Sequence, residues 1–328
     1  MKRISAAVGL ALWALLPVAG IASDTLPLKQ VADLPLPGGT TRFDYESIDP
    51  LTHRLFIAHL GDSRVTVVDT NTLTVVADIP NIGHVHGVLA IPELGRVYAS
   101  ATQTDEVVVI DGKTLQVLGR VPGGIYPDGM AYAPDAHRLF VSDEVGTTET
   151  VIDTETQKRI ETIHLWNVVG NSQYDPVSRH VFVAAQTRNQ LIEIDPMSAS
   201  IVARHELKGA DGPHGLLIDA DSRMAFAACE GNSQLIVFDL VYKKTVASFS
   251  VGGDPDVLAL DTSLHRLYVA GEQGIVSVFS IEPGGVRKIG EGVVGPNAHV
   301  VAVDQQTHRV YFPLKNLDGH PILRVMEP

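Results

Sequence analysis

The sequence predicts an all-β protein, a seven-bladed β-propeller made of four-stranded antiparallel blades. Two observations support this prediction. A unit of about 42 residues recurs seven times, and each copy reads as four short strands separated by turn residues, with almost no helical periodicity. The last copy ends one strand short, while the N-terminal region contains a segment that matches the missing strand.

The repeat is clearest in an alternating run that follows a turn rich in Asp and Pro. The seven runs are DPLTHRLFIAH (49–59), PELGRVYASA (92–101), PDAHRLFVSD (134–143), DPVSRHVFVAA (175–185), DADSRMAFAAC (219–229), DTSLHRLYVAG (261–271) and DQQTHRVYFPL (304–314). Their anchor residues, 42 or 43 positions apart, are Arg54, Arg96, Arg138, His180, Arg223, Arg266 and Arg309. A polar hairpin, a strand such as VTVVD, a T-x-T turn and a strand such as TVVADIP complete each unit, which is the strand content of one blade.

The two ends of the chain predict how the ring closes. The segment LKQVADLPLPGG (28–39) matches the fourth strands LTVVADIPNIG (73–83) and LQVLGRVPGG (115–124). The N-terminal strand should therefore complete the last blade and remove its open edge. Cys229 is the sole cysteine, so this closure has to hold the ring without an internal disulfide.

Three runs, VTVVDTNTLTVVADIP, VVVIDGKTLQVLGRVPGG and HRLFVSD, resemble the repeats of the YVTN family of seven-bladed propellers, which includes YncE-like periplasmic proteins. The resemblance covers residues 28–327, and the four-letter YVTN motif stands here as FIAH, FVSD, FVAA and YVAG. It implies a propeller of WD40-like repeats. It implies no single activity, because seven-bladed propellers include lactonases, haem and copper enzymes and binding scaffolds.

The N-terminus predicts export. Lys2 and Arg3 precede the apolar run SAAVGLALWALLPVAGIA, and small residues before SDTLP suit cleavage of a signal peptide spanning residues 1–23. Residues 24–328 would then form one propeller domain in the periplasm or outside the cell, with no stable membrane insertion. The formal net charge of −13, or −15 after cleavage, argues against nucleic acid as a partner. Cations, small ligands or another protein fit this charge better.

A column of polar residues is predicted where each first strand begins, ten residues before each anchor, with a one-residue shift in the fifth blade. This entrance column consists of Asp44, His86, Asp128, Gly170, His214, Asp256 and His299. First strands line the axis of a propeller, so six Asp or His side chains should surround one mouth of the central channel. A narrow wet channel alone would explain polar residues there. A bound ligand would explain why they are Asp and His.

The order of residues in the column is compatible with a metal site. Carboxylates next to imidazoles orient a histidine and raise its basicity, as in many metal sites. Three neutral imidazoles, His86, His214 and His299, would suit zinc or copper, whereas carboxylates alone would suit calcium. A hydrogen-bonded polar channel without a cofactor, or a site for a small organic ligand, would account for the same column. His84 should point away from His86 and be solvated.

Two further sets of residues extend the predicted site. The hairpins between second and third strands lie on the same face, and there Glu144, Glu230 and Glu272 would form a polar rim. The first strands of blades one and four are unusually polar, FDYES (43–47) and WNVVGNSQY (166–174), so Tyr45, Glu46 and Asn171 are candidate ligand contacts within the channel.

The leading functional hypothesis is an exported, monomeric propeller that binds a small ligand or a metal ion at the mouth of its channel. A second hypothesis is a metal-dependent hydrolase, lactonase or lyase in which His86, His214 or His299 is catalytic and moves a proton. A third is a scaffold for a periplasmic protein, with a purely structural polar ring. The sequence does not decide whether the protein is an enzyme.

Overall fold

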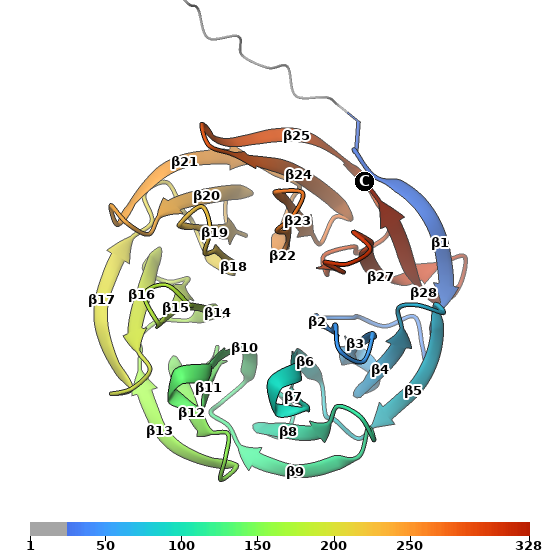
Figure 1. Cartoon of the computed structure of the whole chain (residues 1–328), viewed down its shortest axis with the longest axis horizontal. Helices are drawn as coiled ribbons and strands as arrows, with labels where there is room; N and C mark the ends of the chain where they lie inside the picture. Colours follow the sequence, from blue (N-terminus) through green and yellow to red (C-terminus); the bar gives the residue numbers. More distant parts are fainter. Residues whose placement is uncertain (1–24) are drawn as a thin grey trace, which may run out of the picture.

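The structure is a computed structural model that describes residues 25–328, and these form a closed ring of seven blades around a central axis (Figure 1). Each blade is a four-stranded antiparallel sheet, so the predicted fold class is confirmed. The predicted signal peptide lies outside the described residues. Within residues 25–328, no helix is long and apolar enough to cross a membrane.

In every blade the first strand lies nearest the axis and the fourth lies at the circumference (Figure 1). Blade one contains β2 (Glu46–Asp49), β3 (Arg54–His59), β4 (Arg64–Asp69) and β5 (Thr74–Pro80). Blade two contains β6 (Val85–Ile91), β7 (Arg96–Ala101), β8 (Glu106–Asp111) and β9 (Val117–Pro122). Blade three contains β10 (Pro127–Ala133), β11 (Arg138–Asp143), β12 (Thr148–Asp153) and β13 (Lys158–His164). Blade four contains β14 (Val169–Asp175), β15 (His180–Ala185), β16 (Gln190–Asp195) and β17 (Ser200–Glu206).

The remaining three blades follow the same order. Blade five contains β18 (Pro213–Asp219), β19 (Met224–Cys229), β20 (Gln234–Asp239) and β21 (Lys244–Ser250). Blade six contains β22 (Pro255–Asp261), β23 (Arg266–Gly271), β24 (Ile275–Glu282) and β25 (Gly285–Val293). Blade seven contains β26 (Ala302–Val303), β27 (Val310–Leu317), β28 (His320–Glu327) and β1 (Lys29–Pro35). Three 3-10 turns are η1 (Leu60–Asp62), η2 (Pro92–Leu94) and η3 (Pro134–Ala136).

Aspartates stop the strands at the face of the ring opposite the entrance column. Asp49 ends β2, and its Oδ1 accepts a hydrogen bond from the backbone N–H of Leu51 at 2.9 Å. Asp69 ends β4, and its Oδ1 accepts hydrogen bonds from the N–H groups of Asn71 and Thr72 at 3.0 and 2.8 Å. A side chain that bonds the backbone two or three residues ahead favours a turn over a continued strand. This explains why the repeat places Asp where strands end.

A residue in the left-handed region precedes the second strand of every blade and corrects one alignment. These residues, with φ between 51° and 61°, are His53, Gly95, His137, Arg179, Arg223, His265 and His308. Arg223 therefore occupies the turn position, and Met224 is the residue equivalent to the other anchors. The prediction of Arg223 as an anchor was wrong by one residue. With Met224, the entrance column lies ten residues before the anchor in every blade, without a shift.

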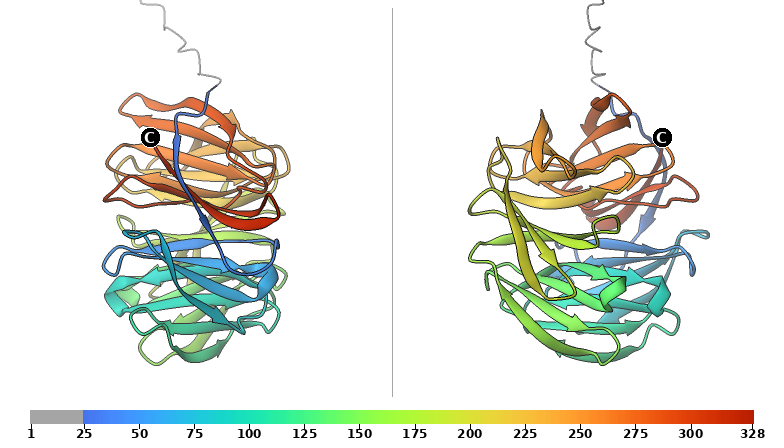
Figure 2. Two further views of the ribbon diagram at one scale, coloured as in Figure 1. Left: turned by 90° about the vertical axis from the view of Figure 1, so that its right-hand side faces the viewer. Right: turned by 60° about the vertical axis from the view of Figure 1, so that its left-hand side comes forward.

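The predicted closure is confirmed. The N-terminal strand β1 pairs antiparallel with β28, from Lys29 opposite Glu327 to Pro35 opposite Ile322. Figure 2 shows β1 running along the C-terminal blade. The guanidinium of Arg324 reinforces the pair by donating two hydrogen bonds, at 2.9 and 2.7 Å, to the carboxylate of Asp33. β28 is therefore paired on both sides, and β1 takes the outer position that the fourth strand has in the other blades.

The core lies between neighbouring blades. Phe56 and Val65 of blade one, for example, share a buried cluster with Val88 and Val97 of blade two. Successive side chains along a strand point to opposite faces, so apolar side chains contact both adjacent blades and the inner strands are buried on both faces. Polar residues are tolerated there only where they are hydrogen-bonded or face the axis. The ring of blades thereby fixes the positions of the residues around the axis.

Candidate functional site: an acidic funnel on the propeller axis

The entrance column surrounds the axis at one end of the ring. Its six Asp and His side chains are all buried, with exposed fractions of 9% or less. Four of them are the second residues of first strands: His86, Asp128, His214 and Asp256. A cavity of about 380 Å³, here called the funnel, is lined by Arg42, Asp44, Leu60, His84, His86, Tyr126, Asp128, Glu144, His214, Glu230 and Asp256. Five of the column residues thus line one cavity, and His299 lies next to it.

Close approach of neighbouring first strands explains why the entrance column has a glycine, Gly170, in blade four. A Cβ on Gly215 would lie 1.7 Å from the carbonyl oxygen of Asp256, so only glycine fits there. Gly170, the column position of blade four, is constrained in the same way, because its Cβ would lie 2.4 Å from the carbonyl oxygen of His214. Blade four therefore contributes no side chain, and His214 Nε2 lies 3.9 Å from Asp128 Oδ2, a residue of blade three.

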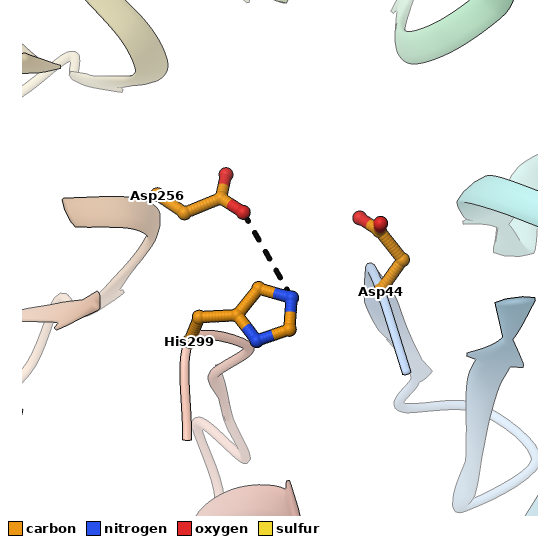
Figure 3. A group of neighbouring side chains, drawn as sticks. All are labelled: Asp44, Asp256 and His299. Atoms are coloured by element: carbon orange, nitrogen blue, oxygen red, sulfur yellow. Dashed lines mark ion pairs between the residues drawn. The ribbon is translucent and has the colours of Figure 1, made fainter. Parts of the chain in front are cut away.

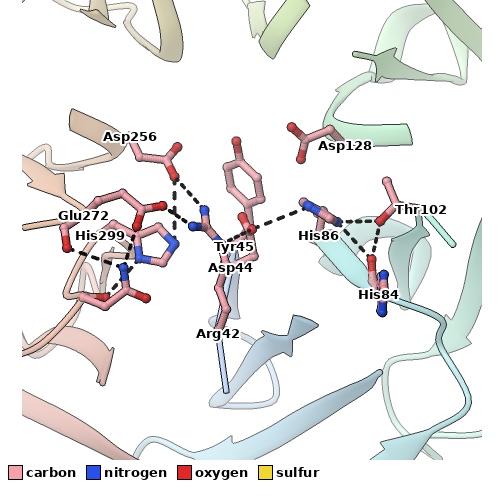
Figure 4. Close-up of polar contacts among 12 residues, drawn as sticks. Arg42, Asp44, Tyr45, His84, His86, Thr102, Asp128, Asp256, Glu272 and His299 are labelled. Carbon is pink, nitrogen blue, oxygen red and sulfur yellow. Dashed lines mark hydrogen bonds and ion pairs between the residues drawn. The ribbon is translucent and has the colours of Figure 1, made fainter. Parts of the chain in front are cut away.

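Arg42 neutralises one side of the funnel. Its guanidinium donates a short hydrogen bond to Glu272, and it lies 3.4 Å from Asp44 Oδ2 and 3.7 Å from Asp256 Oδ2 (Figure 4). Burial opposes the charge of Arg42, but these three carboxylates outweigh it and raise the pKa of the guanidinium. Arg42 is thus a fixed cation beside Asp44 and Asp256.

Two carboxylates that line the funnel each have an oxygen without a hydrogen-bond partner within the residues that the structure describes. Asp128 and Asp256 are 2% and 3% exposed, and the Oδ1 atom of each has no hydrogen-bond partner among residues 25–328. His214 lies between them, with Nε2 3.6 Å from Asp256 Oδ1 and 3.9 Å from Asp128 Oδ2. Its Nδ1 is hydrogen-bonded to the side-chain amide of Gln186 at 2.6 Å. Donor atoms of His214, Asp256 and Glu230 lie within 4.8 Å of one another.

His86 is held by its neighbours. Its Nδ1 lies 2.9 Å from the carbonyl oxygen of His84 and in hydrogen-bond contact with Thr102, and its Nε2 lies 2.9 Å from the hydroxyl of Tyr126 (Figure 4). The distance from Nε2 to Asp44 Oδ2 is 4.0 Å. The side chain of His84 is exposed, as predicted, while its backbone orients the His86 ring.

His299 belongs to a second group of donor atoms. Those of Asp44, Asp256 and His299 lie within 4.8 Å of one another, and Figure 3 shows the Asp256 carboxylate and the His299 ring directed toward each other. Nδ1 of His299 lies 3.0 Å from the Asn297 carbonyl oxygen, whereas Nε2 has no hydrogen-bond partner among the described residues. In the described part of the chain the three predicted metal-binding histidines do not form one donor group: His214 and His299 lie in separate groups that share Asp256, and His86 is in neither.

The predicted rim residues lie at the funnel as well. Glu144 and Glu230 line it, and Glu272 receives the hydrogen bond from Arg42. The side chain of Glu230 is 42% exposed, which places it at the solvent end, 4.0 Å from Nδ1 of His214. Acidic groups thus continue from the buried column to the mouth of the funnel.

Tyr45 forms part of the floor beneath the entrance column. Its hydroxyl lies 3.4 Å from Nε2 of His214, and Figure 4 shows its ring between Asp256 and Asp128. A second cavity of about 140 Å³ lies deeper in the channel and is lined in part by Tyr45, Glu46, Asn171 and Gln173. The polar residues of blades one and four, predicted as channel contacts, therefore meet in one place. Burial raises the pKa of Glu46 well above its usual range.

Burial also favours the protonated, neutral forms of the carboxyl groups in the funnel. It raises the pKa of Asp128 well above its usual range, and it does the same for Asp256, where the charges of Asp44 and Glu230 add to the effect. Burial raises the pKa of Glu230 and lowers that of His299. A cation placed among these groups would favour the ionised carboxylates and compensate their charge.

Two polar residues of the funnel were missed by sequence reasoning. Arg42 and Tyr126 stand two positions before Asp44 and Asp128 of the entrance column, at the place where His84 stands in blade two. Tyr126 and His84 have left-handed backbones, with φ of 61° and 45°, which mark the kink before the strand. Reading the position two residues before the column in every blade would have found both.

Comparison with known proteins supports the propeller fold and nothing more specific. No family model matches the chain, and no curated protein matches it. A solved structure described as Kuenenia stuttgartiensis hydrazine synthase is similar with a TM-score of 0.77 at 15% identity, covering 96% of this chain and 99% of that chain. The WD40 repeats of RRP9 give 0.77 at 10% identity over 92% and 100%, and a chain of the mitotic checkpoint complex gives 0.78 at 12% over 100% and 99%. At such low identities these neighbours support a WD40-like seven-bladed propeller and no particular activity.

Proposed function

We propose that the protein binds a divalent metal ion in the funnel, beside His214 and Asp256. One observation carries this proposal: the carboxylates of Asp128 and Asp256 flank the imidazole of His214, with Asp128 Oδ2 and Asp256 Oδ1 at 3.9 and 3.6 Å from Nε2, and each carboxylate has a buried Oδ1 atom without a hydrogen-bond partner within the described chain. Unpaired buried carboxylate oxygens are costly, and a cation is the partner that satisfies them best. Glu230, at the mouth, is the third member of the donor group that contains His214 and Asp256.

The chemistry of these donors favours a transition metal ion, with zinc the first to test. Imidazole nitrogen combined with carboxylate oxygens is a common zinc environment, whereas calcium prefers six or more oxygens. Metal binding through Nε2 of His214 requires the ring proton on Nδ1, so in the metal-bound protein Nδ1–H would donate its hydrogen bond to the side-chain oxygen of Gln186, while Nε2 faces the two carboxylates. The second donor group, Asp44, Asp256 and His299, is the weaker candidate because Arg42 already lies against two of its members.

Replacing His214 with Ala should weaken metal binding at least about tenfold, equivalent to about 1.4 kcal/mol, because the only imidazole of the donor set is lost. Binding would be measured by isothermal titration with zinc, and metal content by inductively coupled plasma mass spectrometry after reloading with zinc, copper, manganese or calcium. His265→Asn is the matched control, since His265 is exposed on the opposite face and Asn tolerates its left-handed backbone. Failure of the folded wild-type protein to retain any of the four metals would refute the proposal.

Replacing Arg42 with Gln should have the opposite effect. Arg42 competes with an incoming cation for Asp256, so its removal leaves more uncompensated negative charge in the funnel. We expect zinc to bind several-fold more tightly and its binding to become more sensitive to salt. Weaker zinc binding by a folded Arg42→Gln variant would mean that the metal site does not lie beside Asp256.

We infer further that the protein is an exported propeller of the YVTN type. The resemblance of its repeats and the charge pattern of residues 1–23 support this inference. Expression of the full chain in a Gram-negative host, followed by fractionation and mass determination, should find a periplasmic species that begins at or next to residue 24. A cytoplasmic species that retains residue 2 would be inconsistent with it.

A further inference from the structure

One side of the funnel mouth carries an unusual set of exposed apolar side chains. We call it the apolar lip, and it consists of Ile125, Val145, Trp166 and Val168, which are 60%, 61%, 70% and 36% exposed. All four belong to loops on the funnel face, either before a first strand or between a second and a third strand. Large apolar side chains gathered beside a polar cavity often mark an interaction site.

Backbone hydrogen bonds join these loops into one edge. The N–H of Gly146, next to Val145, donates to the carbonyl of Ile125 at 2.9 Å. The N–H of Trp166 donates to the carbonyl of Thr147 at 3.2 Å. The hairpin containing Val145 therefore lies between the loop of Ile125 and the loop of Trp166, and the lip is continuous across blades three and four.

Trp166 is held outward by an unfavourable backbone conformation. Its φ is 59°, a left-handed value that bulky residues rarely adopt, while the side chains of its neighbours Leu165 and Asn167 are buried. Its ring stacks on exposed His164 with centroids 5.0 Å apart. The loop thus fixes the indole of Trp166, the largest side chain of the lip, at the surface and not in the core.

The same loops also contribute polar side chains to the lining of the funnel. Glu144 directly precedes Val145 and lines the funnel, and Tyr126 directly follows Ile125 and lines it too. Glu230 is a further exposed carboxylate at the mouth. The four lip residues themselves are not among the residues that line the funnel. A ligand small enough to be contained in the funnel would leave the lip uncovered.

We propose that the apolar lip and the acidic mouth form one docking surface for a protein partner, which presents a basic side chain flanked by apolar ones. The Lys or Arg of the partner would face Glu144 and Glu230, and its apolar neighbours would cover Trp166 and Val145. A polypeptide is the occupant because the surface extends beyond the funnel over two blades, and a basic one because the protein carries a formal net charge of −13. Exposed aromatic anchors beside charges of one sign are typical of such interfaces.

This surface shares only Glu230 with the proposed metal site, and the variants that test the two proposals change other residues, so the two proposals can fail independently. The metal donors Asp128 and His214 are buried in the column, whereas the lip lies at the surface. A docking partner would cover the mouth above these donors. Substitutions in the lip should leave zinc binding unchanged, and His214→Ala should leave docking unchanged.

The test measures peptide binding through the fluorescence of Trp166. The chain contains two tryptophans, Trp13 and Trp166, so Trp13→Phe leaves Trp166 as the only one. A phage-displayed library of random dodecapeptides would be selected on this protein, and synthetic copies of the selected peptides titrated while the emission of Trp166 is recorded. We expect selected sequences with Lys or Arg next to aromatic or aliphatic residues, and a blue shift of the emission on binding.

Two variants decide the outcome. Ile125→Ser combined with Val145→Ser keeps Trp166 and should weaken peptide binding at least about tenfold, because the apolar contact is lost. Tyr242→Ser is the matched control, since Tyr242 is 73% exposed in a turn on the opposite face and should bind the peptides unchanged. The proposal is overturned if no peptide is selected, if the selected peptides are acidic, or if their binding is the same in the double variant.

Discussion

Replacing Glu149 with Gln should stabilise the protein strongly at alkaline pH and change its stability little near pH 4. Glu149 lies in β12, fully buried, and accepts hydrogen bonds from the hydroxyl groups of Ser172 at 2.7 Å and Ser142 at 3.3 Å. No cation lies among these contacts, and the neighbouring Asp143 is a second buried carboxyl group. Burial therefore raises the pKa of Glu149 to about 8.

The direction of the pH effect follows from the two states of this carboxyl group. In the unfolded chain it ionises near its ordinary pKa of 4.5, whereas in the folded protein it keeps its proton up to about pH 8. Between these values only the unfolded state gains from ionisation, so the free energy of unfolding falls as pH rises, by about 1.4 kcal/mol per pH unit. The full loss at pH 9 is on the order of 5 kcal/mol.

Gln cannot ionise, so the free energy of unfolding of the Glu149→Gln variant should not fall in this way as pH rises. Thermal and urea unfolding at pH 5 and pH 9 would measure it, with Glu155→Gln, an exposed residue of the same blade, as the control. We expect the advantage of Glu149→Gln over the wild type to grow between the two pH values. An equal pH dependence in both proteins would show that Glu149 is ionised in the folded state at neutral pH.

Removing β1 should abolish the stable closed ring. A chain that begins at Pro37 loses the strand paired with β28 at six positions and the buried side chain of Leu36, a member of the cluster that contains Leu323 and Val325. Hydrogen bonds worth about 1 kcal/mol each and the burial of one leucine together predict a loss of about 5 kcal/mol or more. The truncated chain should also aggregate, because β28 becomes an open edge.

A synthetic peptide of residues 25–36 provides the control for this truncation. Added in excess, it should pair with β28 and restore solubility and the unfolding midpoint, since it supplies the backbone pairing, the Asp33–Arg324 ion pair and the apolar contacts of Leu34 and Leu36. The same peptide with Ala32 and Leu34 replaced by Pro should not restore them, because two backbone donors are lost. A truncated chain as stable as the complete one would contradict the importance of the closure.

The repeat made most of the architecture predictable. Every blade repeats the same pattern of buried strands and Asp-stabilised turns, so its period predicted seven blades, the closure by β1 and the position of the entrance column. The repeat could have indicated the position of Arg42 but not its hydrogen bond with Glu272, which is 230 positions away in the sequence and close only in the folded ring. The burial of Glu149 likewise depends on Ser172 of the next blade. Contacts between blades are not encoded in the pattern of any one repeat.

The pairing of β1 with β28 also sets an order of events in time. The remaining strands of the ring pair with sequence neighbours, so each of the first six blades can form from its own stretch of chain, and local pairing is fast. Asp33 and Arg324 are separated by 291 positions, so β1, the first strand to be synthesised, is the last to find its partner. Throughout synthesis β1 has to remain unpaired and soluble. The exposed charges of Lys29 and Asp33 help, because charged side chains on an unpaired strand disfavour aggregation.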